Sequence, residues 1–147
     1  SLIHVYKVFG AVLMTNYAVD PDGLFKFDGF HQVMVSNGSK TIYIAGQVPF
    51  DKDMNFIRKG DYKAQAVQVF KNIAIAVQAA GATPNDVVSS VIYIKGLNSE
   101  AVQEVFKGMA IALDGEPFPA HAYNIVGVQS LADPDVLLEI SAIAVTD

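Results

Sequence analysis

The stretch Val136-Leu-Leu-Glu-Ile-Ser-Ala-Ile-Ala-Val145 decides the fold, because it reads as a strand with apolar residues on both sides. Successive side chains of a strand point to opposite faces of a sheet. One side of this strand carries Val136, Leu138, Ile140, Ala142 and Ala144, and the other carries Leu137, Ile143 and Val145. A strand that is apolar on both sides is typical of a sheet that is covered on both faces.

The predicted elements before the last strand alternate between helices and strands. We expect helices from Asp61 to Ala80, with Gly81 at the C-cap, and from Asn98 or Ser99 to Leu113. We expect strands from Val87 to Ile94 and from Tyr123 to Gln129.

Two shorter apolar runs, Gln32 to Val35 and Thr41 to Val48, precede the first helix. The Asn37-Gly38 pair between them favours the positive φ angles of a tight turn, so the sequence predicts a β-hairpin. Residues 1–29 are read as an N-terminal extension with a short strand around His4 to Val8, and residues 30–147 as one domain.

The order β-β-α-β-α-β-β predicts an α+β fold with one mixed, five-stranded sheet. Two helices can cover only one face of such a sheet. The opposite face would leave a large apolar patch, and its natural cover is another copy of the chain. The sequence therefore predicts a homo-oligomer.

Composition excludes several classes of function. The 147 residues are 52% hydrophobic and 17% charged, with a net charge of −5, no Cys and one Arg, Arg58. The absence of Cys excludes disulfides and thiolate metal sites, and the acidic charge argues against nucleic-acid binding. No apolar run approaches the roughly 18 residues that span a bilayer, and the start does not read as a signal peptide. We expect a cytoplasmic protein with neither a nucleic-acid nor a membrane partner.

Glu139 is the strongest candidate for chemistry, because it interrupts the second apolar face of the last strand. A buried carboxylate must be paired, protonated or directed into a polar cleft. Glu139 is either a general acid/base or water-positioning group at a subunit boundary, or else an edge residue or a structural ion pair.

Gly46 and Gln47 directly follow the buried strand Thr41 to Ala45. A glycine there either lets a ligand or another backbone approach closely, or marks a bulge that ends the strand.

The three histidines, His4, His31 and His121, lack the spacing of metal ligands, so we expect no metal. His31 and His121 could each approach a cleft, although a partly exposed loop histidine is the commoner case. Phosphate-binding and Gly-x-Ser-x-Gly motifs are also missing.

The chain resembles the RidA/YjgF/YER057c/UK114 superfamily from about Phe30 to Val145. The resemblance rests on Ile42-Tyr-Ile-Ala-Gly-Gln-Val-Pro49, the helix that carries Gln65 and ends in Ala79-Ala-Gly81, the strand from Val87 and the last strand. It implies a chorismate-mutase-like fold, a homotrimer and ligand clefts between subunits. It also implies cofactor-independent hydrolysis of enamines and imines, such as 2-aminoacrylate, to 2-keto acids and ammonia.

Position by position, the resemblance implies which residues line the cleft. Phe30 matches an aromatic wall, and Asn98 matches a polar residue at the subunit boundary. Glu139 matches the glutamate that holds the attacking water. The turn of the cleft matches Ala45, Gly46 and Gln47.

Deaminating members of the superfamily carry an Arg after Pro-Ala, which grips the substrate carboxylate through two hydrogen bonds. Aligning on Pro119-Ala120 places His121 at that position, whereas counting back from Val128 and Leu131 places Tyr123 there. Neither residue can reproduce a bidentate, permanently charged clamp. The chain thus resembles branches without this Arg, for which the usual deamination of amino-acid imines is not implied.

Two functions follow from the residues and the resemblance. One is a RidA-like hydrolase, cofactor-independent, in which Glu139 positions water for an imine or a related labile compound. The other is a non-catalytic ligand-binding or regulatory module of the same fold. Ribonuclease activity, an older label in the superfamily, fits this acidic chain poorly.

Overall fold

The structure is a computed structural model that describes residues 15–147. Its elements in chain order are β1 (Asn16–Val19), β2 (Val33–Ser36), β3 (Lys40–Gln47), α2 (Tyr62–Ala79), the 3-10 turn η1 (Pro84–Asp86), β4 (Val87–Lys95), α3 (Ser99–Met109), β5 (Ala122–Val128) and β6 (Leu138–Thr146). The predicted helices and the later strands are confirmed, although α3 ends at Met109 rather than Leu113. The strand predicted around His4 lies outside the described residues.

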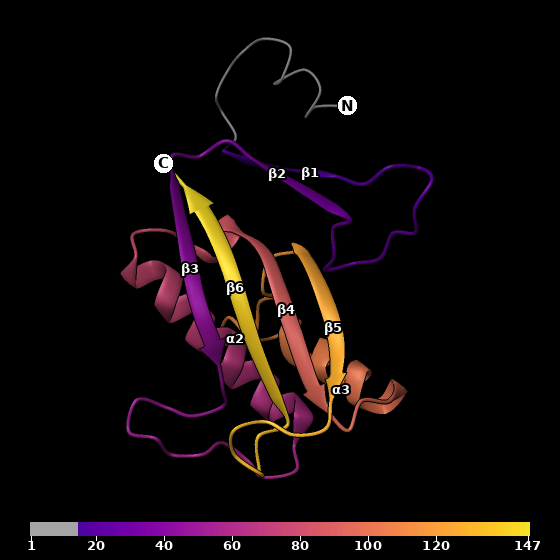
Figure 1. The fold of residues 1–147 in the computed structure, drawn as a ribbon, viewed down its shortest axis with the longest axis vertical. Coiled ribbons are helices and arrows are strands. Elements are labelled where there is room, and N and C mark those ends of the chain that lie inside the picture. Colours follow the sequence, from indigo (N-terminus) through magenta and orange to yellow (C-terminus); the bar gives the residue numbers. More distant parts are fainter. Residues whose placement is uncertain (1–14) are drawn as a thin grey trace.

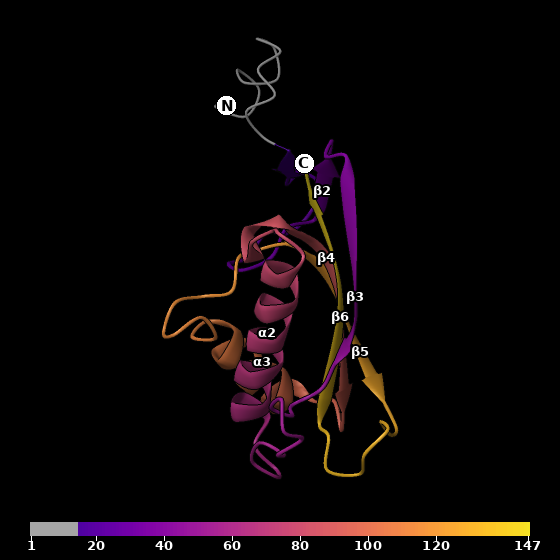
Figure 2. The ribbon, with the colours of Figure 1, turned by 90° about the vertical axis from the view of Figure 1, so that its left-hand side faces the viewer.

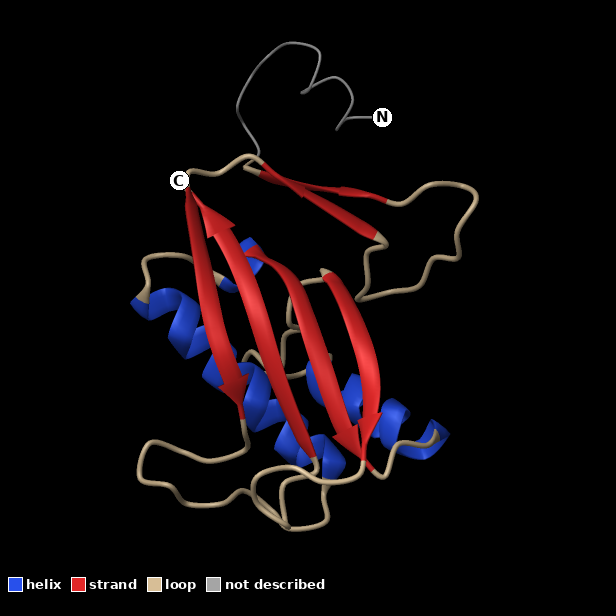
Figure 3. Ribbon diagram, viewed as in Figure 1, coloured by secondary structure: helices blue, strands red, loops and turns tan. Residues whose placement is uncertain are grey.

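The main sheet has four strands in the order β3-β6-β4-β5 (Figure 1). Strands β4 and β5 are parallel, and the other neighbours are antiparallel, so the prediction of a mixed sheet is confirmed. Both helices lie on one face of this sheet, and none of the elements described for residues 15–147 lies on the other face (Figures 2 and 3). Neither helix has the length and apolarity needed to cross a bilayer.

The predicted hairpin between β2 and β3 is wrong. Strand β2 pairs with β1 in a separate two-stranded sheet, while β3 pairs with β6. Asn37 and Gly38 do not adopt the positive φ angles of a tight hairpin turn. Gly38 instead permits a close crossing, because a Cβ atom there would lie 2.6 Å from Thr15 Cγ2 and 2.8 Å from Val145 Cγ1. The main sheet therefore has four strands rather than five.

Strands β1 and β2 lie across the end of the main sheet, near the C-terminal end of β6 (Figure 1). Asn16 Nδ2 donates to the Val145 carbonyl at 2.9 Å, and the Asn37 N–H donates to the Thr15 carbonyl at 2.7 Å. The expected domain boundary between residues 29 and 30 thus falls in the connection between two paired strands.

Local sequence signals explain where the helices begin and end. The Asp61 side chain accepts a hydrogen bond from Ala64 N at 2.9 Å, which caps the start of α2. Gly81 follows the helix with a φ of +86°, a conformation that glycine adopts without steric cost. Asn98 caps α3 in the same way as Asp61, accepting from Ala101 N at 2.8 Å.

The core lies between the two helices and one face of the sheet. Its largest apolar members include Phe70, Ile73, Ile92, Phe118 and Ile140, each at most 2% exposed. Along β6, residues 138, 140, 142 and 144 are buried against the helices, while 139, 141 and 143 are half-buried on the face without helices. We call this second surface the open face. Its residues include Tyr43, which is 79% exposed.

Candidate functional site

Glu139 lies on the open face, in a strand that has neighbours on both sides. Strand β6 runs between β3 and β4, and Glu139 stands opposite Tyr93 of β4. The Glu139 side chain forms no hydrogen bond or ion pair within residues 15–147. The interpretation of Glu139 as an edge residue or a structural ion pair is therefore wrong for the single chain.

The Glu139 side chain lies against Gly46 of β3. A Cβ atom at position 46 would lie 2.7 Å from Glu139 Cδ and 3.0 Å from Glu139 Cγ. The pairing of β3 with β6 also slips here, because Ile44 pairs with Ala142 but Gln47 pairs with Ile140. The slip agrees with the interpretation of Gly46 as a bulge, and the group that approaches the glycine closely is the Glu139 carboxylate rather than a ligand or another backbone.

Ala45 and Gln47 flank this glycine, and the Gln47 side chain folds back onto its own strand. Gln47 Nε2 donates to the Ala45 carbonyl at 3.0 Å. Ala45 itself is exposed. The predicted turn residues therefore lie beside Glu139, although the polar end of Gln47 is occupied locally.

Gln65, which is fully buried in α2, holds the chain that leads into β6. Gln65 Nε2 donates to the carbonyls of Arg58 and Asp135 at 3.1 and 3.2 Å, and Gln65 Oε1 accepts from Leu137 N at 2.9 Å. The two bonds to Asp135 and Leu137 hold the chain at the start of β6, just before Glu139, and the third ties the loop before α2 to the same side chain.

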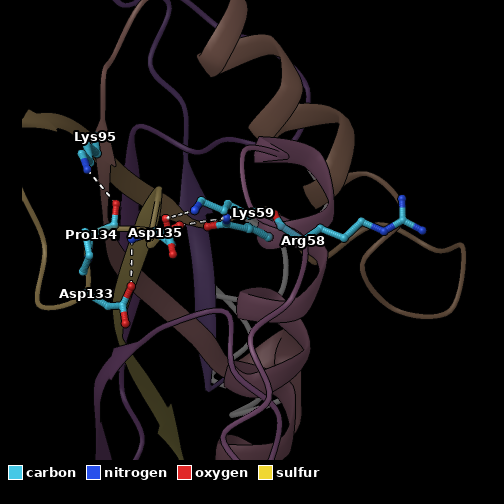
Figure 4. Close-up of polar contacts among 7 residues, drawn as sticks. Arg58, Lys59, Lys95, Asp133, Pro134 and Asp135 are labelled. Carbon is cyan, nitrogen blue, oxygen red and sulfur yellow. Dashed lines mark hydrogen bonds and ion pairs between the residues drawn. The ribbon is translucent and has the colours of Figure 1, made fainter.

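Two lysines hold the same loop from outside (Figure 4). Lys95 Nζ donates to the Pro134 carbonyl at 2.8 Å, and Lys59 Nζ lies 3.4 Å from Asp135 Oδ1. The Arg58 guanidinium points away from this loop and is largely exposed. The guanidinium of this single arginine lies 3.8 Å from Asp61 Oδ2, and Arg58 lines none of the cavities described here.

Asn98 lies at the loop end of β4 and lines a cavity of about 450 Å³ with Lys59, Tyr62 and Glu100. Its side-chain oxygen caps α3, whereas its side-chain nitrogen makes no hydrogen bond within the described chain. That nitrogen is available as a donor.

His121 is fully buried, in contrast to the expected partly exposed loop histidine. Its Nδ1 lies 2.9 Å from the Pro119 carbonyl, and its Nε2 lies 2.7 Å from Ser90 Oγ. Because a carbonyl only accepts, Nδ1 carries the proton and the Ser90 hydroxyl donates to Nε2. Burial lowers the pKa of His121 to about 4, so the ring is neutral at pH 7.

Phe30 and Tyr123 lie together beside His121. The rings of Phe30 and Tyr123 meet edge to face with centroids 5.1 Å apart. His31 N donates to the His121 carbonyl at 3.0 Å, which joins the segment before β2 to the start of β5. Burial raises the pKa of Tyr123 to about 12. The region at the start of β5 therefore offers an aromatic wall and a phenol that stays protonated.

A cavity of about 190 Å³ opens between these segments. Its lining consists of Phe30, His31, Gln32, Ser89, Ser90, Val91, Ala122, Tyr123 and Asn124. The volume is below the 300–1,000 Å³ of sites for drug-sized ligands, so it suits a small metabolite. Within residues 15–147 no group of three or more His, Asp or Glu side chains could hold a metal ion.

The predicted site residues form two groups at different places on the sheet. Tyr123 pairs with Ser90 of β4, whereas Glu139 pairs with Tyr93, three residues further along the same strand. Three residues of strand correspond to about 10 Å. Tyr123 also faces the helices, while Glu139 is on the open face. One chain does not bring Phe30, His121 and Tyr123 together with Gly46 and Glu139.

Two features of this region were not predicted from the sequence. One is the hydrogen bond of Ser90 to His121, and the other is the pairing of Asp20 with His31. Ser90 is 3% exposed and alternates in phase with Val88 and Ile92, which marks it as core-facing. No comparable signal pairs Asp20 with His31, because the segment between them is an irregular loop.

Comparison with known proteins agrees with this architecture. The model of the family described as endoribonuclease L-PSP matches residues 27–146. A RutC family protein of Pyrococcus abyssi is 41% identical over 104 residues, which are 70% of this chain and 76% of that protein.

Solved structures of similar proteins extend the comparison. The Rid-family protein YyfB of Yersinia pestis is 30% identical with a TM-score of 0.77, over 90% of this chain and 99% of that one. RidA of an Antarctic Psychrobacter is 34% identical with a TM-score of 0.59, over 76% of this chain and 87% of that one.

Proposed function

The chain belongs to the endoribonuclease L-PSP family, within the RidA/YjgF/YER057c/UK114 superfamily, and from this premise we propose that it binds a small metabolite between two copies of itself. The proposed assembly is a homotrimer. Each cleft takes Phe30 and Tyr123 from one subunit and Gly46, Asn98 and Glu139 from its neighbour. The ligand is processed without a metal or an organic cofactor.

The separation of the two groups of residues supports a cleft between copies. Tyr123 and Glu139 are on different faces of one sheet, so a single chain cannot offer both to one ligand. The open face is also bare of any element, and its strands carry Tyr43, Val91 and Ile143 toward that side. A second copy packed there covers this apolar surface and supplies the missing group.

The free carboxylate of Glu139 is the observation that carries the catalytic proposal. A half-buried glutamate in a central strand, held beside Gly46 without an ion pair, is available to accept a hydrogen bond from water. In the proposed reaction Glu139 accepts a proton from water as the water oxygen adds to the carbon of a C=N bond, and this proton passes to the nitrogen. The second water proton, on the new hydroxyl group, then also moves to the nitrogen as the C–N bond breaks, which releases ammonia and leaves a C=O group.

The ligand that suits this cleft differs from a simple amino-acid imine. His121 is fully buried with both ring nitrogens occupied, and Tyr123 can donate one hydrogen bond. The guanidinium of Arg58, the single arginine, lies 3.8 Å from Asp61 Oδ2 at the start of α2. A substrate carboxylate would lack a bidentate cationic partner in the Phe30 group of residues.

The lack of a bidentate cationic partner for a substrate carboxylate favours a second candidate, a binding or regulatory module without turnover. Loss of a charged hydrogen bond to substrate costs about 1.5–3 kcal/mol, which is one to two orders of magnitude in rate. A cleft that has lost such a contact can retain a ligand and lose the reaction. Glu139 would then act only as a hydrogen-bond acceptor.

Ammonia release from the uncharged amide of 2-iminobutyrate, compared with release from 2-iminobutyrate itself, separates the two candidates. We expect release from the amide above the uncatalysed rate, little acceleration for the anion, and a fall of at least about 100-fold for the amide in Glu139→Gln. Glu116→Gln, at an exposed turn, is the matched control and retains the wild-type rate. Equal rates in wild type and Glu139→Gln would exclude the catalytic role.

Light scattering tests the assembly. The expected mass is three times 15.8 kDa. A monomer at assay concentration would overturn the proposed cleft, because Tyr123 and Glu139 would then never face the same ligand.

A further inference from the structure

His31 is held by a carboxylate that lies outside the predicted site. His31 Nδ1 lies 2.7 Å from Asp20 Oδ2, and Asp20 Oδ1 accepts a hydrogen bond from Gln32 N at 2.8 Å. The Gln32 N–H lowers the pKa of Asp20, so this group is an ionised carboxylate at pH 7. A carboxylate can only accept, and Nδ1 of His31 therefore carries the proton.

This tautomer leaves the second ring nitrogen of His31 as an acceptor. Nε2 keeps its lone pair, and no residue of the described chain bonds to it. The side chain is 30% exposed and lines the cavity of about 190 Å³ described above. An oriented, basic nitrogen at a cavity is the arrangement that accepts a proton or a hydrogen bond from a ligand.

Tyr123 lines the same cavity and provides its second polar group. The residue is 8% exposed, and its hydroxyl makes no hydrogen bond within residues 15–147. The hydroxyl still reaches solvent, because Asn16 Oδ1 is the one fully buried side-chain nitrogen or oxygen without a partner in the described residues. The Tyr123 hydroxyl is therefore available to donate a hydrogen bond to a ligand.

The cavity also has a chemical preference. Its lining contains no Lys or Arg, and the Asp20 carboxylate lies directly behind His31. An anionic ligand would meet this negative charge with no cation in the cavity lining, because Lys26, which interacts with Asp20, lines a different cavity. An uncharged ligand meets no such repulsion.

We propose that His31 Nε2 and the Tyr123 hydroxyl bind a small uncharged molecule that presents an O–H or N–H donor beside an oxygen acceptor. The donor of the ligand bonds to His31 Nε2, and Tyr123 donates to its oxygen. Amides and similar neutral compounds have this pattern. The inference rests on the proposed metabolite-binding function and specifies its ligand class, with Asp20 as the positioning residue.

Asp20→Asn is the sharpest perturbation of this arrangement. The Asn oxygen can still accept from Gln32 N, which places its NH2 group toward His31. Nδ1 of His31 must then accept, and the proton moves to Nε2. The substitution reverses the tautomer while keeping the shape of the side chain.

Nitrogen-15 NMR of the imidazole rings tests the proposal with 2-hydroxybutyramide as the probe and 2-hydroxybutyrate as its anionic counterpart. His31→Gln identifies the His31 signals. We expect the amide to shift Nε2 of His31 in a saturable manner, at concentrations at least about 10-fold lower than the acid. Tyr123→Phe should weaken amide binding about 10-fold.

Asp20→Asn should change the His31 spectrum from the Nδ1–H to the Nε2–H pattern and weaken amide binding. Asp22→Asn is the matched control, because Asp22 is exposed and lies two positions away. It should leave both the His31 spectrum and amide binding unchanged. No saturable shift, or equal binding by wild type and Tyr123→Phe, would overturn the proposal. Asp20, His31 and Tyr123 belong to one chain, so amide binding by an inactive or monomeric protein would refute only the proposed hydrolysis or assembly.

Discussion

His121 should make the stability of this protein fall as the pH drops below neutrality. The ring is fully buried, donates from Nδ1 to the Pro119 carbonyl and accepts from Ser90 at Nε2. Burial lowers the pKa of His121 from 6.5 to about 4. The folded protein therefore resists protonation over a range of pH in which the unfolded chain takes up a proton.

The sign and size of the effect follow from these two pKa values. At pH 7 His121 is mostly neutral in both the folded and the unfolded state, so the neutral ring contributes fully to the free energy of unfolding. As the pH falls from about 6.5 toward about 4, only the unfolded state binds the proton, and the free energy of unfolding decreases. Between pH 7 and pH 5 the decrease is about 2 kcal/mol.

Urea unfolding of wild type and His121→Phe at pH 7 and pH 5 measures the contribution of His121 to this loss of stability. At pH 7 the variant should be less stable by about 1–3 kcal/mol, because Ser90 and the Pro119 carbonyl lose their partner. At pH 5 the gap should shrink by about 2 kcal/mol. Protein concentration is held constant, since assembly also contributes to stability.

Gln78→Ala is the control, because Gln78 is exposed and does not titrate. It should leave the difference between the two pH values close to that of wild type. NMR titration of the folded wild type provides a second measurement, in which the His121 ring stays neutral at pH 5. An identical pH dependence in wild type and His121→Phe, or a His121 ring that titrates near pH 6.5, would refute the reasoning.

Two substitutions test the surroundings of Glu139. Gly46→Ala places a Cβ atom 2.7 Å from Glu139 Cδ, so we expect a loss of about 1–3 kcal/mol in urea unfolding and reduced ammonia release. Gly23→Ala, where a Cβ meets nothing within 4 Å, should change neither, and the reasoning fails if both variants behave alike. Gln65→Ala leaves Arg58 O, Asp135 O and Leu137 N unpaired, at about 1–3 kcal/mol for each buried group. The exposed Gln78→Ala should be neutral in the same unfolding experiment, and equal stability of the two Gln variants would contradict the role of Gln65.

The helices and the faces of the strands were predictable because their signals are local. Asp61, Asn98 and Gly81 terminate helices through bonds or φ angles that involve only a few neighbouring residues. Alternation along β6 likewise placed Glu139 on the face opposite Leu138 and Ile140. The prediction of only two helices indicated that helices would cover one face of the sheet.

The hairpin prediction failed because the Asn37-Gly38 signal has more than one structural use. Glycine permits both a positive φ and a close approach of other chains, and sequence spacing does not distinguish them. Here Gly38 lies against Thr15 and Val145, one of them more than 100 residues away along the chain. That contact exists only once β6 is in place.

The candidate site was likewise only partly predictable from the sequence. The residue types of Phe30, Gly46, Tyr123 and Glu139 were enough to select them as candidates, but not to predict that they form two groups. Their separation depends on strand order and register, which arise from contacts between distant segments. The burial of His121 and the pairing of Asp20 with His31 depend on such contacts as well.

The sequence by itself determined the α+β class, the helix limits near Asp61 and Asn98, and the two-sided character of the last strand. These properties follow from periodicity and capping, which act over a few residues. Only the tertiary structure decided that β2 pairs with β1, that Glu139 lies free beside Gly46, and that His31 is oriented by Asp20. Each of these depends on packing between segments whose relative positions no local pattern encodes.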